Sequence, residues 1–205
     1  MIRKPSNWEN VQPFPERQKL PLGAYVCKVM NAIVARTNYG EMLQLSFDIA
    51  EGEYKDYFRK DYFRKDYKGS MGTNKKWRGV LRVFLPVDDN TEKDEITKRT
   101  LAGMVTAFEN SNPGYKWDWN EKSLEGKTVG ILFRNEEWEY NGQKGWAVRP
   151  FRALSADTVR EGNFTLPKDK PLQGSVTPAA SYTNAPAAPA QNNGFTQVED
   201  DDMPF

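Results

Sequence analysis

The sequence predicts a mainly β domain, a five-stranded barrel with one helix between its third and fourth strands, followed by a disordered tail. Two patterns predict the domain: several segments alternate apolar and polar residues as half-buried strands do, and one segment repeats apolar residues at helical spacing. A third pattern predicts the tail. Residues 171–198 carry no charge and are mostly Ala, Pro, Asn, Gln, Ser and Thr, which bury too little apolar surface to offset the entropy of ordering.

The first three strands are expected in the first half of the chain. Residues 1–20 are polar and contain three prolines, which predicts an extended arm. The segment 23–35 is rich in β-forming residues, and 42–50 (MLQLSFDIA) alternates cleanly after the turn residues 38–40. The third strand is expected at 80–86 (VLRVFLP).

A helix is expected next. Thr91 and Asp94 form the start signal known as a capping box. Leu101, Met104, Val105 and Phe108 then follow at i, i+3, i+4 and i+7, as one apolar helix face requires. Residues 110–114 (NSNPG) end the helix.

The last two strands are expected to form a hairpin with arms at 127–140 and 146–154. Asn141 and Gly142 supply the positive φ angles of its turn. The order strand, strand, strand, helix, strand, strand is that of the OB-fold, a Greek-key barrel that often binds oligonucleotides. Another small α+β or barrel domain is the alternative.

The composition narrows the function classes. The chain has 205 residues, one cysteine, Cys27, and no histidine. Without histidine it lacks the commonest general base and metal ligand, and a single cysteine forms no internal disulfide or cysteine-based zinc site. No apolar run suits a membrane span or a secretory signal. We therefore expect a cytoplasmic, non-enzymatic protein with no cofactor and no metal.

The net charge of +1 conceals a polarised chain. Residues 54–82 carry ten basic and three acidic residues, a local charge of +7. Residues 165–205 carry two basic and five acidic residues, a local charge of −3. The positive charge is therefore local, and the opposite charge lies at the far end of the chain.

Residues 56–69 (DYFRKDYFRKDYKG) repeat the unit Asp-Tyr-Phe-Arg-Lys twice and begin a third copy. A period of five changes faces on a strand and advances about 140° per copy on a helix, so neither element gains an apolar stripe. We therefore expect an exposed, extended excursion over residues 54–78.

Aromatic rings among Arg and Lys suit single-stranded nucleic acid, because bases stack on the rings and basic side chains neutralise phosphates. The candidate contacts in this segment are Tyr57, Phe58, Arg59, Lys60, Tyr62, Phe63, Arg64, Lys65, Trp77 and Arg78. The alternative is a solvated hairpin whose tyrosines pack on their neighbours and whose three aspartates pair with Lys and Arg.

The second hairpin adds the candidates Trp138 and Arg149. Other aromatic and basic residues accompany them along the arms, namely Arg134, Tyr140, Trp146 and Arg152. In OB-folds the loop between strands four and five reaches over the ligand, but tryptophans near a turn also form cross-strand packing pairs. Trp117 and Trp119 are expected in the core or a cap and are assigned no function.

These patterns divide the chain into four parts. We expect an extended arm at 1–20, the OB-type domain at 21–164, a disordered linker at 165–198 and an acidic tip at 199–205. The tip has four consecutive acids followed by Met, Pro and Phe. A chance acidic ending is the alternative.

This tip, behind a barrel with basic aromatic loops, resembles that of the bacterial single-stranded DNA-binding proteins (SSBs). Their C-terminal tip is a short acidic run ending in a Pro-Phe carboxylate, and the matching residues here are Asp200, Asp201, Asp202, Met203, Pro204 and Phe205. The resemblance implies a non-catalytic protein that coats single-stranded DNA in replication, recombination and repair. It also implies that the tip docks helicase, primase, nuclease and recombination-mediator partners.

Two features differ from the cellular members. The first strand starts only near Gly23, without their Gly-Arg-Leu type of opening, and the five-residue repeat is an insertion. In these respects the chain is more similar to a divergent, phage-encoded SSB, which implies a bacterial or phage-infected cytoplasm and leaves a homo-oligomer open. The alternative functions are an interaction adaptor, an RNA-binding OB protein, or a carboxylate-metal nuclease.

Overall fold

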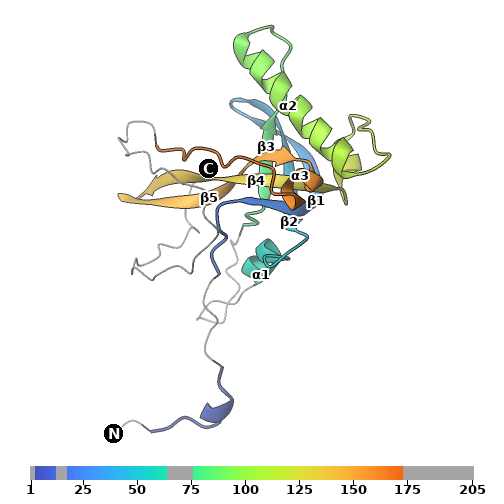
Figure 1. The fold of residues 1–205 in the computed structure, drawn as a ribbon. Coiled ribbons are helices and arrows are strands. Elements are labelled where there is room, and N and C mark those ends of the chain that lie inside the picture. The colour runs from blue at the N-terminus through green and yellow to red at the C-terminus, as the bar shows by residue number, and fades with distance from the viewer. Residues whose placement is uncertain (1–2, 13–17, 64–75, 173–205) are drawn as a thin grey trace.

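The computed structural model describes residues 3–12, 18–63 and 76–172 (Figure 1). The elements in chain order are the 3-10 helix η1 (Trp8–Asn10), β1 (Ala24–Thr37), β2 (Gly40–Ile49), α1 (Tyr57–Phe63), β3 (Val80–Phe84), α2 (Glu92–Ser111), η2 (Glu121–Leu124), β4 (Thr128–Tyr140), β5 (Gln143–Leu154) and α3 (Ala156–Arg160). The mainly β class and the five strands are confirmed, as is a helix directly after the third strand.

The five strands form one antiparallel sheet in the order β3-β2-β1-β4-β5. The two outermost strands, β3 and β5, also contact each other. Their backbones form no ladder in the described part of the chain, so the sheet is open where a barrel would close. The closed OB-fold barrel is therefore not confirmed.

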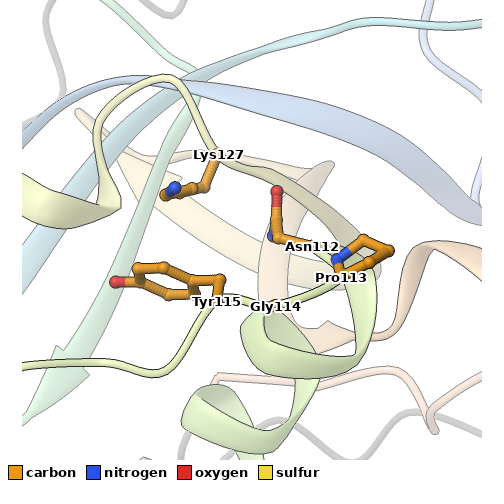
Figure 2. Close-up of a pocket in the computed structure, with 5 residues that line it drawn as sticks. All are labelled: Asn112, Pro113, Gly114, Tyr115 and Lys127. Atoms are coloured by element: carbon orange, nitrogen blue, oxygen red, sulfur yellow. The ribbon is translucent and has the colours of Figure 1, made fainter.

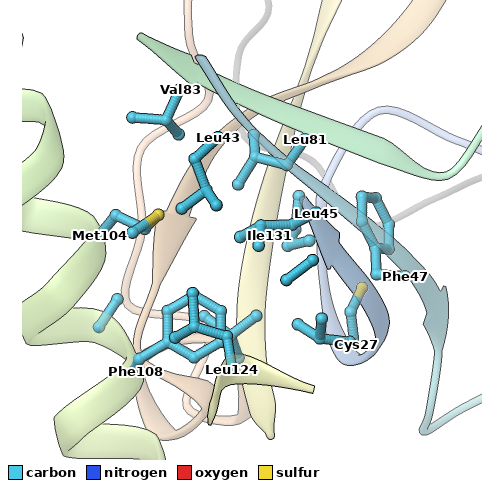
Figure 3. Close-up of a cluster of buried hydrophobic side chains, with 14 of the residues drawn as sticks. Cys27, Leu43, Leu45, Phe47, Leu81, Val83, Met104, Phe108, Leu124 and Ile131 are labelled. Carbon is cyan, nitrogen blue, oxygen red and sulfur yellow. The ribbon is translucent and has the colours of Figure 1, made fainter. Parts of the chain in front are cut away.

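The part of the core drawn in Figure 3 lies between the sheet and α2. Leu43, Leu45 and Phe47 of β2 are fully buried, as their alternation predicts. The predicted apolar face of α2 packs on them from the other side, with Met104 and Phe108 at its centre. Burial of such side chains contributes roughly 1.5–3 kcal/mol each, so the alternating pattern and the helix face together specify this core.

The start of α2 confirms the Thr91 half of the predicted capping box, whereas the Thr91 backbone amide donates to Asp89 and not to Asp94. The Thr91 hydroxyl accepts a hydrogen bond from the backbone amide of Asp94 at 3.2 Å. The Asp94 carboxylate is itself buried, accepts hydrogen bonds from the amides of Val87 and Asp88, and pairs with Lys98 at 2.9 Å. Lys98 first, and then these amides, hold the pKa of Asp94 below its ordinary value. The carboxylate thus joins the β3–α2 connection to the helix.

The turn of the β4–β5 hairpin is also as predicted. Asn141 and Gly142 have φ angles of 48° and 77°, which reverse the chain between the strands. β4 and β5 are long, and their hairpin projects beyond the rest of the sheet (Figure 1).

The expectation of an extended excursion over residues 54–78 is wrong for Tyr57–Phe63, which form helix α1. The cause lies in β2, where the buried Asp48 carboxylate accepts hydrogen bonds from the backbone amides of Phe58 and Arg59, both at 3.0 Å. Amides in the first turn of a helix otherwise lack partners. Burial raises the pKa of Asp48, and its backbone hydrogen bonds oppose that shift.

The arm predicted for residues 1–20 is exposed over 3–12, with a single 3-10 turn at Trp8–Asn10. Leu20, its last residue, is instead buried in the core. The domain therefore begins slightly before its predicted boundary.

Candidate nucleic-acid interface

The candidate residues on α1 differ in exposure, although they occupy equivalent positions in the two copies of the repeat. Phe58 of the first copy is 7% exposed, whereas Phe63 of the second copy is 57% exposed. Five residues advance a helix by about 140°, so equivalent residues of the two copies point in different directions. The expectation that the repeat buries no side chain is therefore wrong for Phe58.

The ring of Phe58 is part of the core. It stacks on Phe133 of β4 at 6.3 Å between ring centroids and meets Phe47 of β2 edge-on at 5.4 Å. It also lies 6.5 Å from Trp77. A ring enclosed in this way has no face left for a base, so we withdraw Phe58 from the candidate contacts.

The remaining described candidates of this segment lie around α1. Arg59, Lys60 and Phe63 are exposed. Tyr57 and Tyr62 are half-buried, and Tyr62 lies 5.7 Å from the Trp77 ring. This packing of tyrosines on neighbouring rings matches the alternative interpretation of the repeat in part.

Trp77 and Arg78 connect this cluster to β3. The Trp77 indole nitrogen donates to the backbone carbonyls of Phe47 and Gly79, which fixes the half-buried ring beside β2. Arg78 lies 3.9 Å from the Asp61 carboxylate. Two groups of candidates lie outside the described residues, namely Arg64 and Lys65 of the repeat and Asp200, Asp201, Asp202, Met203, Pro204 and Phe205 of the tip.

A second group of basic residues gathers on the β4–β5 hairpin. Arg134 of β4 and Arg149 of β5 are directly opposite in the antiparallel register, so their side chains share one face. Arg82 of β3 is close enough to Arg149 for the charge of Arg149 to lower its pKa, in addition to the larger effect of burial. Like charges directly opposite destabilise a sheet, so this arrangement does not serve stability.

A β-bulge brings a third arginine of the hairpin to the same face. Leu132 pairs with Arg152 and Phe133 pairs with Pro150, which leaves Phe151 as the extra residue on β5. In a regular strand Arg149 and Arg152 would point to opposite faces, because they are three positions apart and successive side chains alternate. The bulge adds one residue and so places both on the Arg134 face.

Phe151 lies between two of these arginines. Its ring centroid is 4.2 Å from the Arg134 guanidinium carbon and 6.0 Å from that of Arg152, and the side chain is 36% exposed. We call Arg82, Arg134, Arg149, Arg152 and Phe151 the arginine face. An exposed ring flanked by cations offers a base a stacking surface and offers the adjoining phosphates positive charge.

Trp138 lies on the same side of the hairpin, nearer its tip. It pairs with Gly145, and its ring covers that glycine so closely that an added Cβ would lie 2.7 Å from the ring. Trp146 pairs with Glu137 and therefore points to the opposite face. Trp138 thus makes a cross-strand packing contact with Gly145, as the alternative expected, although it does not pair with Trp146. Trp138 remains a half-buried candidate at the edge of the arginine face.

Of the two placements expected for Trp117 and Trp119, core or cap, the core is wrong for Trp119, which directly precedes Asn120, the N-cap of η2. Trp117 is half-buried against the core. Trp119 is 71% exposed, and its ring lies 4.8 Å from that of Trp117.

Figure 2 shows a shallow pocket beside this loop, where the Lys127 ammonium lies 4.3 Å over the Tyr115 ring.

The polar groups of this pocket already have partners. The Asn112 side-chain amide donates to the carbonyls of Phe108 and Thr128, and its oxygen accepts from the Thr128 amide. Asn112 therefore joins the end of α2 to the start of β4 (Figure 2). We assign the pocket a structural role.

After α3 the chain returns to the hairpin and adds to its edge (Figure 1). β1 pairs with β4 only as far as Leu132, and beyond that point residues 169–172 run along β4 instead. Lys170 donates its backbone amide to the Asn135 carbonyl and accepts from the Glu137 amide, both at 2.9 Å. This is a parallel bridge on the strand that carries Arg134.

Two further hydrogen bonds hold this segment, which we call the strap. The Asn135 amide group donates to the Asp169 carboxylate at 3.1 Å, and the Leu172 backbone amide donates to the Glu137 carboxylate at 2.9 Å. The predicted linker over 165–198 is therefore wrong for residues 169–172, which are bound to the domain. Its remainder from residue 173 lies outside the described residues.

No protein-family model matches the chain, and no curated protein matches it significantly. Within the described ranges, no group of three or more His, Cys, Asp or Glu residues could hold a metal ion. Nor is any helix in those ranges long and apolar enough to cross a membrane.

Sequence reasoning proposed Arg149 but missed most of the arginine face. The sequence pattern places Arg134 and Arg152 along the hairpin arms without marking them as DNA contacts, and it does not select Phe151 or Arg82. Alternation alone would separate Arg149 from Arg152, and only the bulge unites them. Pro150 beside Phe151 was the available signal, because proline within a strand often marks a bulge.

Proposed function

We propose that this protein binds single-stranded DNA without catalysis, through the arginine face together with the exposed residues of α1. We further propose an OB-type barrel as the frame, and a role in coating single-stranded DNA during replication, recombination and repair in a bacterial or phage-infected cell. The resemblance of residues 200–205 to the SSB tip supports the same assignment.

The observation that carries the proposal is the exposed Phe151 ring beside Arg134 and Arg152, with Arg149 directly opposite Arg134 on the same face. Arg134 and Arg149 lie opposite each other, the Glu136 carboxylate offsets part of their repulsion by pairing with Arg134, and a phosphate between the two arginines would reduce the rest. Stacking on Phe151 is insensitive to base identity, because every base presents a π face. We therefore expect the protein to bind single-stranded DNA with little preference for its base sequence.

Titration of the protein with a labelled oligonucleotide tests the proposal. We expect tight binding to single-stranded DNA, much weaker binding to a duplex of the same sequence, and a steep loss of affinity as salt increases. Fluorescence anisotropy at several salt concentrations measures all three. Equal affinity for duplex and single strand would contradict the proposal, and a preference for single-stranded RNA would favour the RNA-binding alternative.

We also propose that residues 200–205 dock helicase, primase, nuclease or recombination-mediator proteins. Changing Phe205 to Ala is expected to abolish such docking, because an aromatic side chain is the apolar anchor of a short acidic segment. Single-stranded DNA binding is expected to persist in the variant. Surface plasmon resonance with a panel of these purified bacterial proteins measures docking, with Phe195→Ala in the neutral linker as the matched control. If F205A lost its affinity for single-stranded DNA instead, residue 205 would belong to the DNA site.

A further inference from the structure

We infer that the strap, residues 169–172, is a positioning element of the DNA interface that holds Arg134 in its binding orientation. The inference rests on the proposed function and deepens it. The strap carries no aromatic side chain and acts through one acidic residue of β4, Glu136.

The strap brackets Glu136. Its two backbone hydrogen bonds reach the residues on either side, Asn135 and Glu137. The Lys170 ammonium also lies 3.9 Å from the Glu136 carboxylate. Lys170 therefore holds the backbone on both sides of Glu136, and its ammonium lies beside the Glu136 carboxylate.

Glu136 in turn holds Arg134. One terminal guanidinium nitrogen of Arg134 donates to the Glu136 carboxylate at 2.5 Å, and both side chains are largely buried, with 20% and 24% of their surface exposed. In this position the guanidinium lies over the Phe151 ring at 4.2 Å. An arginine that is fixed before the ligand arrives loses less side-chain entropy on binding.

If Glu136 acted only through its charge, its removal would have the opposite effect on DNA affinity from the one that a positioning role predicts. A carboxylate beside a phosphate-binding arginine repels the phosphate, so its removal would strengthen DNA binding if repulsion were its only effect. If Glu136 positions Arg134, its removal weakens binding although the face becomes more positive. The two roles therefore differ in the sign of one measured change.

The first experiment compares Glu136→Ala with Glu139→Ala in the full chain. Glu139 lies on the other face of the same strand and pairs with Lys144 at 3.2 Å, so both variants lose one acid from β4. We expect E136A to bind single-stranded oligonucleotide several-fold more weakly, with the slope of log affinity against log salt reduced by about 0.7, the loss of one phosphate contact. We expect E139A to bind with equal or higher affinity.

The second experiment breaks the strap itself. Lys170→Pro removes the backbone amide that donates to Asn135, whereas Lys168→Pro removes the same charge two residues earlier, where the described structure shows no such bond. We expect K170P to match E136A in affinity and salt slope and K168P to match the wild type. Thermal unfolding of each variant checks that the domain remains folded.

The outcomes separate the two proposals. If the wild-type protein fails to bind single-stranded DNA, the proposed function is wrong and the positioning role falls with it. If the wild type binds and E136A binds equally or more tightly, only the positioning role is wrong. If E136A binds more weakly but K170P binds as K168P does, Glu136 orients Arg134 without the strap, and the role of the strap is overturned.

Discussion

Replacing Phe58 by Ala is expected to destabilise the domain by about 3–5 kcal/mol, the usual cost of emptying a buried phenylalanine site. The ring packs against Phe47 and Phe133 and is almost fully enclosed. Gly79 shows how tight this site is, because an added Cβ there would lie 2.8 Å from the Phe58 ring. Urea unfolding followed by tryptophan fluorescence measures the loss.

The repeat supplies a matched control. Phe63→Ala removes the same ring from the second copy, where it is mostly exposed, and is expected to change stability by less than about 0.5 kcal/mol. The two variants differ only in the copy that is changed. If F58A and F63A unfold at the same urea concentration, the docking of α1 against the core is wrong.

The second large effect is expected at the arginine face. Phe151→Leu keeps an apolar side chain at the bulge but removes the aromatic face, and stacking of a base on such a face contributes roughly 1–3 kcal/mol. We therefore expect about 5- to 150-fold weaker binding of single-stranded oligonucleotide, since each 1.4 kcal/mol is tenfold. Anisotropy titration at fixed salt measures the change.

Arg149→Ala tests the charge of the same face. It removes the cation that lies opposite Arg134, and we expect weaker binding with a salt slope reduced by about 0.7. Arg99→Ala on the exposed side of α2 removes an equal charge away from the face and is expected to bind as the wild type does. Equal losses for R149A and R99A would show that only net charge matters and that the arginine face is not the site.

Local sequence patterns predicted the parts of the fold that depend on local interactions. The alternation in β2, the cap at Thr91 and the Asn141-Gly142 turn each appear as expected, because a strand face, a helix start and a tight turn are specified within a few residues. These local patterns also predicted the order of the five strands along the chain and the position of the long helix α2 after the third strand.

The features that sequence reasoning missed depend on residues far apart in the chain. The first turn of helix α1 donates two backbone amides to Asp48, which lies in the preceding strand β2, and no period within the repeat reveals that contact. The strap pairs with a strand that lies more than thirty residues earlier. The arginine face unites β3, β4 and β5, and it requires a bulge that shifts the facing of one residue.

The strap is also the segment through which a pulling force on the chain after Leu172 would reach the domain. A partner protein that pulls on residues beyond Leu172 pulls first on the strap and, through its hydrogen bonds, on β4. Because the strap runs parallel to β4, traction toward the hairpin tip loads these bonds together in shear, whereas traction away from the strand breaks them one at a time. The direction of pull would then decide whether the strand that carries Arg134 feels the force or is released from it.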